Sequence, residues 1–266
     1  MSKSKKKKEE AKSNAPMLII GAVLVAGGLF AWYMFSSAKS APRSNTNTNT
    51  AANSKVTPVK ADSIPPNAPP GANPPNQAGS PSAAVTLEEF ADFQCGSCAA
   101  AHPIMNEIKS TYGSRIRFVF RNYPLSIAAH DKAYEAAVAV EAAGMQGKFW
   151  DLQNLLFNNQ QIWTAAPTYK QIWKDYAAKV GLDVAKWEND MAGIAAKSRV
   201  DADIARGRAI GVNSTPSVYI NGSAVPYTEI KVASLKALID AEIQKSNAAN
   251  APAQPAASDK PADASK

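Results

Sequence analysis

Two cysteines with two residues between them, Cys95-Gly96-Ser97-Cys98, are the residues of this chain whose types and spacing are best suited to chemistry. They follow a strand-like run and stand where a helical pattern begins. A helix N-terminus offers unpaired N–H groups and the positive end of the helix dipole, and both stabilise a thiolate. We therefore expect a pair that cycles between dithiol and disulfide.

The same spacing also occurs in zinc sites and in small structural disulfides. A structural zinc site needs four ligands, and besides the two cysteines the chain offers only His102 and His130. Copper is another alternative, because thiolates and a histidine together suit that metal. We favour redox chemistry, with neither a cofactor nor a bound metal ion, because of the position of the pair at a strand-to-helix turn.

The elements that must position the cysteines follow from the periodicity of the apolar residues. Val85–Ala91 is predicted to be a strand, Cys98–Tyr112 a helix that stops at Gly113, and Arg115–Arg121 a second strand. Such a unit requires a right-handed crossover and parallel strands. The cysteines then stand at its first turn.

The rest of the globular part reads as a helical block followed by a hairpin. The turn Asn221-Gly222 should join the strand Ser217–Ile220 to Ser223–Pro226, and a last helix should cover Glu229–Lys245. The helical block is predicted to comprise Asp131–Ala143, Phe149–Phe157, Tyr169–Val180 and Val184–Ile210, with a break near Gly193.

Four blocks of the chain, at residues 85–98, 118–125, 146–150 and 211–222, resemble the DsbA-like family of extracytoplasmic thiol:disulfide oxidoreductases, especially its Gram-positive and membrane-anchored branches. The blocks occur in the order found in that family. The resemblance implies an α/β thioredoxin fold with an inserted all-helical subdomain at about residues 128–210. It also implies an enzyme that introduces disulfide bonds into secreted or membrane proteins, with a disulfide reductase or isomerase as the alternative.

The resemblance further assigns roles to residues of the site. Cys95 would be the exposed nucleophile and Cys98 the buried resolving thiol of a redox-active disulfide. The Thr215-Pro216 peptide bond would be cis and lie against that disulfide, whereas an ordinary trans proline opening a strand is the alternative. With Gly96 and Ser97, Thr215 would contact the substrate.

A buried acid is often found beneath the resolving cysteine in the superfamily, and Glu89 is our candidate for it. A carboxylate with a raised pKa could move the proton of Cys98. Its neighbour Glu88 is the competing candidate. Gly96-Ser97 carries no imidazolium, so we expect the pKa of Cys95 to be lowered less than in family members with a histidine there.

The N-terminal part is predicted to cross a membrane. Residues 1–12 carry six lysines and two glutamates, and 21 uncharged residues follow at 15–35. This pattern predicts a single-pass anchor at 15–37 with a cytoplasmic N-terminus, while a signal peptide cleaved near residue 38 is the alternative. The basic residues farther along form no dense cluster, so we expect no nucleic-acid binding.

The predicted boundaries place a monomeric catalytic domain outside the membrane. Reduced proteins would be its substrates, and a quinone-linked membrane protein of the DsbB or vitamin K epoxide reductase-like type would reoxidise it. The predicted segments are a cytoplasmic basic segment at 1–14, the anchor at 15–37, a disordered Pro/Asn-rich linker at 38–83, the catalytic domain at 84–246 and a disordered tail at 247–266.

Overall fold

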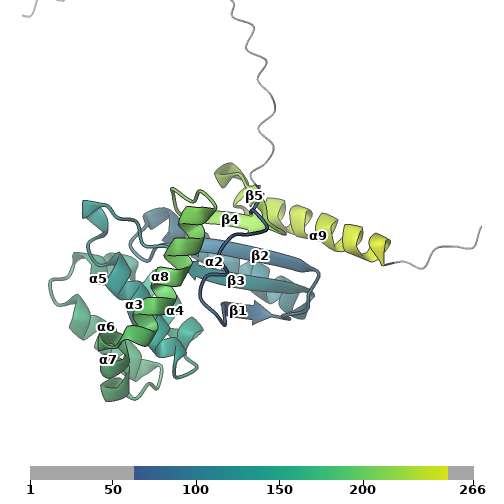
Figure 1. Cartoon of the computed structure of the whole chain (residues 1–266). Coiled ribbons are helices and arrows are strands. Elements are labelled where there is room, and N and C mark those ends of the chain that lie inside the picture. The colour runs from purple at the N-terminus through teal and green to yellow at the C-terminus, as the bar shows by residue number, and fades with distance from the viewer. Residues whose placement is uncertain (1–62, 251–266) are drawn as a thin grey trace, which may run out of the picture. The chain divides into compact units, whose positions relative to one another are not determined.

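The computed structural model describes residues 63–250 of the 266-residue chain (Figure 1). Within that range five strands form one sheet in the order β1-β3-β2-β4-β5. β2 and β3 are parallel, and the other neighbouring strands are antiparallel. The elements are β1 (Asn76–Gly79), β2 (Val85–Ala91), α2 (Gly96–Tyr112), η1 (Gly113–Arg115), β3 (Ile116–Asn122), η2 (Ala128–His130), α3 (Ala133–Gly144), α4 (Phe149–Asn158), α5 (Gln160–Ala165), α6 (Tyr169–Lys179), α7 (Val184–Ala192), α8 (Ile194–Ala209), β4 (Ser217–Ile220), β5 (Ser223–Val225), η3 (Tyr227–Glu229) and α9 (Val232–Ala249).

Helices cover both faces of the sheet. In the view of Figure 1, α8 crosses in front of the sheet and α2 lies behind it, while α3 to α7 gather at one end. The face toward α2 is apolar, with Leu87 of β2 and Phe118 of β3 in the same core cluster as Met105 and Ile108 of α2. This packing fixes α2, and with it the cysteines, against the end of β2.

Most elements agree with the sequence prediction. β2 has the predicted bounds, the hairpin turns at Asn221-Gly222, and Gly193 separates α7 from α8. The helical block between β3 and β4 is confirmed as well. These elements were predictable because their periodicity and turn residues lie within short stretches of sequence.

The predicted start of the domain at residue 84 is wrong. Residues 63–79, which we call the N-terminal strap, belong to the folded domain, and β1 within it pairs with β3. Asp203 of α8 accepts a hydrogen bond from the Ala72 N–H at 2.8 Å, and Arg121 of β3 donates to the Ala72 oxygen at 3.1 Å. The strap is polar, and its hydrogen-bond partners are far away in the sequence. The sequence therefore did not show that the strap is ordered.

The other end also differs slightly, since α9 continues to Ala249 and passes the predicted boundary at 246. The predicted basic segment, the anchor at 15–37 and most of the predicted linker lie outside the described residues. No helix within residues 63–250 is long and apolar enough to cross a membrane.

Candidate active site

The two cysteines lie where the chain passes from β2 into α2. Cys95 is the N-cap residue of α2, and Cys98 lies in its first turn. The Cys95 oxygen accepts hydrogen bonds from the N–H groups of Cys98 and Ala99, both at 3.1 Å. No side chain caps this helix, so its first N–H groups remain available to the Cys95 sulfur.

A loop from the other half of the domain lies against Cys95. The peptide bond between Thr215 and Pro216, directly before β4, is cis as expected. The Cys95 Sγ lies 3.3 Å from the Thr215 oxygen, where the thiol donates a hydrogen bond. The fold therefore brings together the CxxC turn and the predicted substrate-binding loop, which are 120 residues apart.

The two thiols have different surroundings. Cys95 keeps 9% of its surface exposed and Cys98 none. A hydrogen bond from the Cys98 thiol, together with the N–H groups of Cys98 and Ser97, lowers the pKa of Cys95 to about 5 against the opposing effect of burial. Burial raises the pKa of Cys98 well above its ordinary value. The pair is thus poised as a thiolate at Cys95 and a thiol at Cys98.

The residues between the cysteines are accessible. Gly96 is exposed, and a Cβ atom added there would meet no more distant part of the protein within 4 Å. Ser97 lines a cavity of about 300 Å³ together with Ala101 and Tyr227. The pKa of Cys95 is lowered although neither residue carries an imidazole, so hydrogen bonds within the turn stabilise the thiolate.

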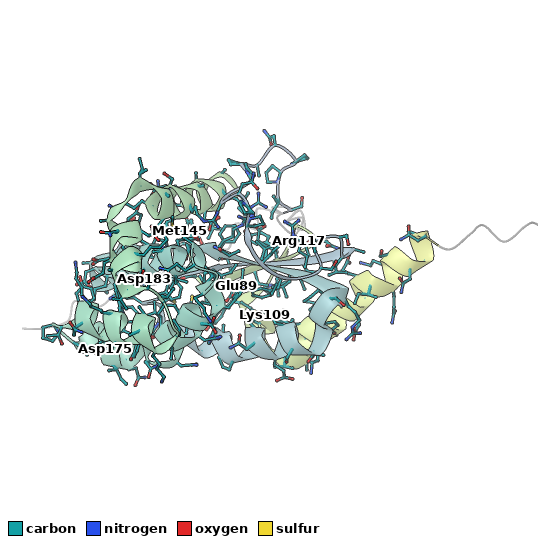
Figure 2. The ribbon with its side chains drawn as sticks, turned by 90° about the horizontal axis from the view of Figure 1, so that it is seen from below. Glu89, Lys109, Arg117, Met145, Asp175 and Asp183 are labelled. Carbon is teal, nitrogen blue, oxygen red and sulfur yellow. The ribbon has the colours of Figure 1, made fainter. Side chains whose placement is uncertain are left out.

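Glu89 is a buried acid on the α2 face of the sheet. It is 3% exposed, and burial raises its pKa to about 7, with the charge of Lys109 acting in the opposite direction. Lys109 belongs to α2 and lies beside Glu89 (Figure 2), and burial lowers its pKa to about 8. The Lys109 Nζ also lies 4.3 Å from the ring centre of Trp150. Glu89 therefore has a raised pKa, while proton transfer between Glu89 and Cys98 stays a prediction.

Glu88, the competing candidate, is held in a charge cluster. Its carboxylate accepts hydrogen bonds from Arg121 Nε at 2.6 Å and from Arg206 Nε at 2.7 Å. Although burial raises the pKa of Glu88, the hydrogen bond from Arg206 and the charge of Arg121 bring it below its ordinary value. Glu88 therefore remains ionised and ties β2 to β3 and α8.

The two histidines are engaged within the domain. Burial lowers the pKa of His102 to about 4, and its ring stacks on Phe157 and contacts Asn106 at 3.0 Å. His130 Nδ1 lies 2.7 Å from an Asp92 carboxylate oxygen. Within residues 63–250, no three His, Cys, Asp or Glu side chains are grouped so that they could hold a metal ion.

Two residues near the dithiol were not found from the sequence. Asp92 donates its N–H to the Cys98 Sγ at 3.5 Å. Gln160 of α5 donates from its amide to the oxygens of Phe93 at 2.7 Å and Cys95 at 2.9 Å. A buried acid three residues before Cys95 was the available signal for Asp92, whereas nothing near Gln160 in the sequence indicates its contact with the turn.

A family model described as Thioredoxin matches residues 73–241 of this chain. The match covers more than half of the sequence and includes the CxxC turn and the cis-proline loop. The chain therefore belongs to the thioredoxin family.

Several solved structures share the fold. They include a thioredoxin-like oxidoreductase from Silicibacter pomeroyi DSS-3, with 24% identity and a TM-score of 0.54, where the match covers 68% of this chain and 94% of that one. BdbD from Bacillus subtilis, in its oxidised form, has 21% identity and a TM-score of 0.57, and the match covers 66% of this chain and 98% of that one. The expected DsbA-like arrangement, a thioredoxin fold with a helical insertion, is thus confirmed as a fold.

Curated relatives match over a shorter segment. The Na(+)/H(+) antiporter NhaA 1 of Mycolicibacterium gilvum (strain PYR-GCK) is 33% identical over 146 residues, which is 54% of this chain and 23% of the antiporter. NhaA of Herminiimonas arsenicoxydans is 33% identical over 144 residues, 54% of this chain and 22% of that protein. The chain spans less than a quarter of these relatives, so the similarity concerns one segment of each.

Proposed function

We propose that the chain is an extracytoplasmic thiol:disulfide oxidoreductase that introduces disulfide bonds into secreted or membrane proteins through Cys95 and Cys98. The observation that carries this proposal is the opposite shift of the two thiol pKa values. A thiolate stabilised at Cys95 favours the reduced protein, and a favoured reduced form makes the disulfide a strong oxidant. The lowering of the Cys95 pKa to about 5 supports an oxidase more than a reductase.

The reaction uses the asymmetry of the pair. A substrate thiolate attacks the Cys95 sulfur, the protein disulfide breaks, and its electron pair remains on the Cys98 sulfur. The second substrate thiol then attacks the first substrate sulfur and releases Cys95 as a thiolate. The substrate loses two electrons and two protons, of which one proton ends on Cys98 and the other in solvent.

The surface around the turn suits an unfolded polypeptide. Two large apolar side chains in cavities beside the turn are exposed, Tyr227 at 62% and Ile162 at 59%. Tyr227 shares the cavity of Ser97, and Ile162 shares a cavity of about 550 Å³ with Gly96. Apolar side chains of a substrate would occupy these cavities while its backbone approaches the Thr215-Pro216 loop.

Reduction potential and substrate oxidation test this proposal together. Equilibration with glutathione should give a potential less negative than about −200 mV, and the purified disulfide form should oxidise a reduced multi-cysteine protein stoichiometrically. A potential of about −270 mV, typical of thioredoxin, would instead support the reductase alternative.

Copper binding has no support from the geometry, since His102 and His130 are engaged elsewhere.

The proposed location rests on the sequence of residues 1–62. A single-pass anchor at 15–37 would hold the domain outside the membrane, within reach of a quinone-linked reoxidase. Protease added to intact cells, or to spheroplasts if there is an outer membrane, should release the folded domain by cutting before residue 63. A fully protected chain would place the domain inside and refute the location.

A further inference from the structure

Gln160 of α5 holds the main chain of the CxxC turn from a distant part of the chain. Its side-chain amide nitrogen donates to the Phe93 oxygen at 2.7 Å and to the Cys95 oxygen at 2.9 Å. The residue is 8% exposed. One buried amide group therefore fixes the main chain on both sides of Gln94.

The short helix that carries Gln160 is itself firmly packed. Trp163, one turn farther along α5, is fully buried, and its Nε1 donates to the Leu156 oxygen at 2.8 Å. Its ring packs against Trp173 of α6, with 5.1 Å between the ring centres. The helical block between β3 and β4 thus holds the Gln160 amide in place against the turn.

The Cys95 oxygen decides where α2 begins. As the N-cap carbonyl it also accepts hydrogen bonds from the N–H groups of Cys98 and Ala99. The N–H groups of Ser97 and Cys98 in the same turn stabilise the Cys95 thiolate. Because hydrogen bonds weaken steeply as their angle departs from the optimum, a shift of the turn would weaken this stabilisation.

The Gln160 contact matters most when the disulfide is open. In the oxidised protein the bond between Cys95 and Cys98 closes the turn covalently. In the structure both cysteines are free thiols, and non-covalent contacts alone set the position of the Cys95 sulfur. Removing a buried donor leaves its acceptors unpaired, which is costly. The reduced turn would relax to relieve this cost, whereas the disulfide would hold the oxidised turn.

We propose that Gln160 is a positioning residue for the reduced dithiol: its amide keeps the turn in the conformation in which the N–H groups of Ser97 and Cys98 stabilise the Cys95 sulfur as a thiolate. This inference rests on the proposed redox function of Cys95 and Cys98. Through this contact the helical block contributes to the oxidising strength of the pair, since a stabilised thiolate favours the reduced protein.

The effect of removing the amide should be moderate, because a second side chain ties the turn to the helical block. Gln94 Nε2 donates to Asp131 Oδ1 at 3.1 Å, and Gln94 Oε1 accepts from the Lys132 N–H. These contacts remain in a Gln160 variant and limit how far the turn can move.

Gln160→Met tests the proposal, since methionine has a similar length and no donor. Equilibration with glutathione at about pH 7 should give an equilibrium constant for reduction about three- to tenfold below that of the unchanged protein, or about 15 to 30 mV. The same change corresponds to a rise of roughly half to one unit in the Cys95 pKa, which the thiolate absorbance of the reduced protein measures.

The stability of the two redox forms separates positioning from a purely structural role. A residue that only stabilises the fold would contribute equally to the free energy of unfolding of the oxidised and the reduced protein, and its loss would leave the potential unchanged. Gln160→Met should instead destabilise the reduced form more, as urea unfolding of both forms measures.

Gln146→Met is the matched control. The Gln146 side chain also binds main chain in the helical block, donating to the Asp183 oxygen at 3.1 Å and accepting from the Asp183 N–H at 3.0 Å. Its loss should leave the potential unchanged. Gln160→Leu, a second variant without a donor, should change the potential in the same direction as Gln160→Met, and it decides if Gln160→Met does not fold.

The outcomes distinguish this inference from the proposed function. An unchanged potential in Gln160→Met and Gln160→Leu, or an equal loss of stability in both redox forms, would overturn the positioning role and leave the redox function intact. A lowered potential in a protein whose unchanged form already lies at about −270 mV would support the positioning role and refute the oxidase. A protein that forms no Cys95–Cys98 disulfide in any glutathione buffer would overturn both.

Discussion

Glu88 and Glu89 are neighbours in β2, both are buried, and their pKa values move in opposite directions. Glu88 points to the α8 face, where two guanidinium groups lie within hydrogen-bonding distance. Glu89 points to the α2 face, where Lys109 is its charged neighbour and an apolar core surrounds it. The number of close cationic partners, rather than burial, decides which acid stays ionised.

The contrast between Glu88 and Glu89 indicates that the two faces of the sheet have different roles. On the α8 face, fully paired charges hold the N-terminal strap and α8 to the strands. On the α2 face, a single incompletely paired acid shares an apolar core with the helix that bears the dithiol. We therefore expect changes on the α8 face to lower stability, whereas changes on the α2 face alter redox chemistry or the way stability depends on pH.

The largest effect should come from the cysteines on the α2 face. Cys95→Ala should abolish catalysed oxidation of a reduced substrate, because the attacked sulfur is gone, whereas Cys98→Ala should accumulate mixed disulfides with substrates. Non-reducing electrophoresis of protein mixed with substrate distinguishes the two variants. Mixed disulfides accumulating on Cys98 in the Cys95→Ala protein would reverse the assigned roles.

The next effect concerns stability from the α8 face. Glu88→Gln leaves the partly buried Arg121 and Arg206 without their shared carboxylate and should lower the free energy of unfolding by about 3 kcal/mol. Urea unfolding measures this loss, and Glu188→Gln, in an exposed ion pair with Lys174, is the matched control at no more than about 1 kcal/mol. A large change in reduction potential without loss of stability would break the division between the faces.

Glu89→Gln should change how stability depends on pH. The pKa of Glu89 is raised from 4.5 to about 7 in the folded protein, so the folded state binds this proton more tightly than the unfolded state does. The contribution of this tighter proton binding to the free energy of unfolding is complete below pH 4.5 and is lost as the pH rises to about 7. The loss amounts to up to about 3 kcal/mol. The variant should lack this decline.

Unfolding of both proteins in urea at several pH values measures this difference. The variant should match the unchanged protein in acid and be the more stable of the two above neutral pH. Identical pH profiles would show that Glu89 keeps an ordinary pKa, and the contrast with Glu88 would disappear.

Ser97→His should have the smallest effect. An imidazolium beside Cys95 should lower the thiol pKa further by up to about one unit and raise the reduction potential by up to about 30 mV, or about 1.4 kcal/mol. Ser97→Asn, polar but uncharged, is the control. An unchanged potential would mean that hydrogen bonds within the turn and the Thr215-Pro216 loop set the potential alone.

The sequence was enough to predict the elements whose pattern lies within a short stretch of the chain. β2, the helix after the CxxC turn and the Asn221-Gly222 hairpin each have their periodicity or turn residues within a few positions. Glu89 was chosen as the buried acid from the family resemblance, and alternation along β2 agrees with its position on the apolar face.

Features that depend on distant segments could not be predicted in this way. Alternation places Glu88 opposite Glu89, in solvent, but α8 and the N-terminal strap cover that face and bury it. β1 is short and polar, and its order depends on pairing with β3. The contact of Gln160 with the oxygen of Cys95 joins residues 65 positions apart, and no local pattern reports such a contact.

The pKa of Cys95 in the reduced protein is the most direct test of the central claim, that the turn stabilises a thiolate at one cysteine and a thiol at the other. The ultraviolet absorbance of the thiolate, followed against pH with Cys95→Ala as the blank, gives this value. The account predicts a midpoint at about 5 for Cys95 and no Cys98 thiolate at neutral pH. A midpoint for Cys95 near the ordinary thiol value of 9.0 would contradict it.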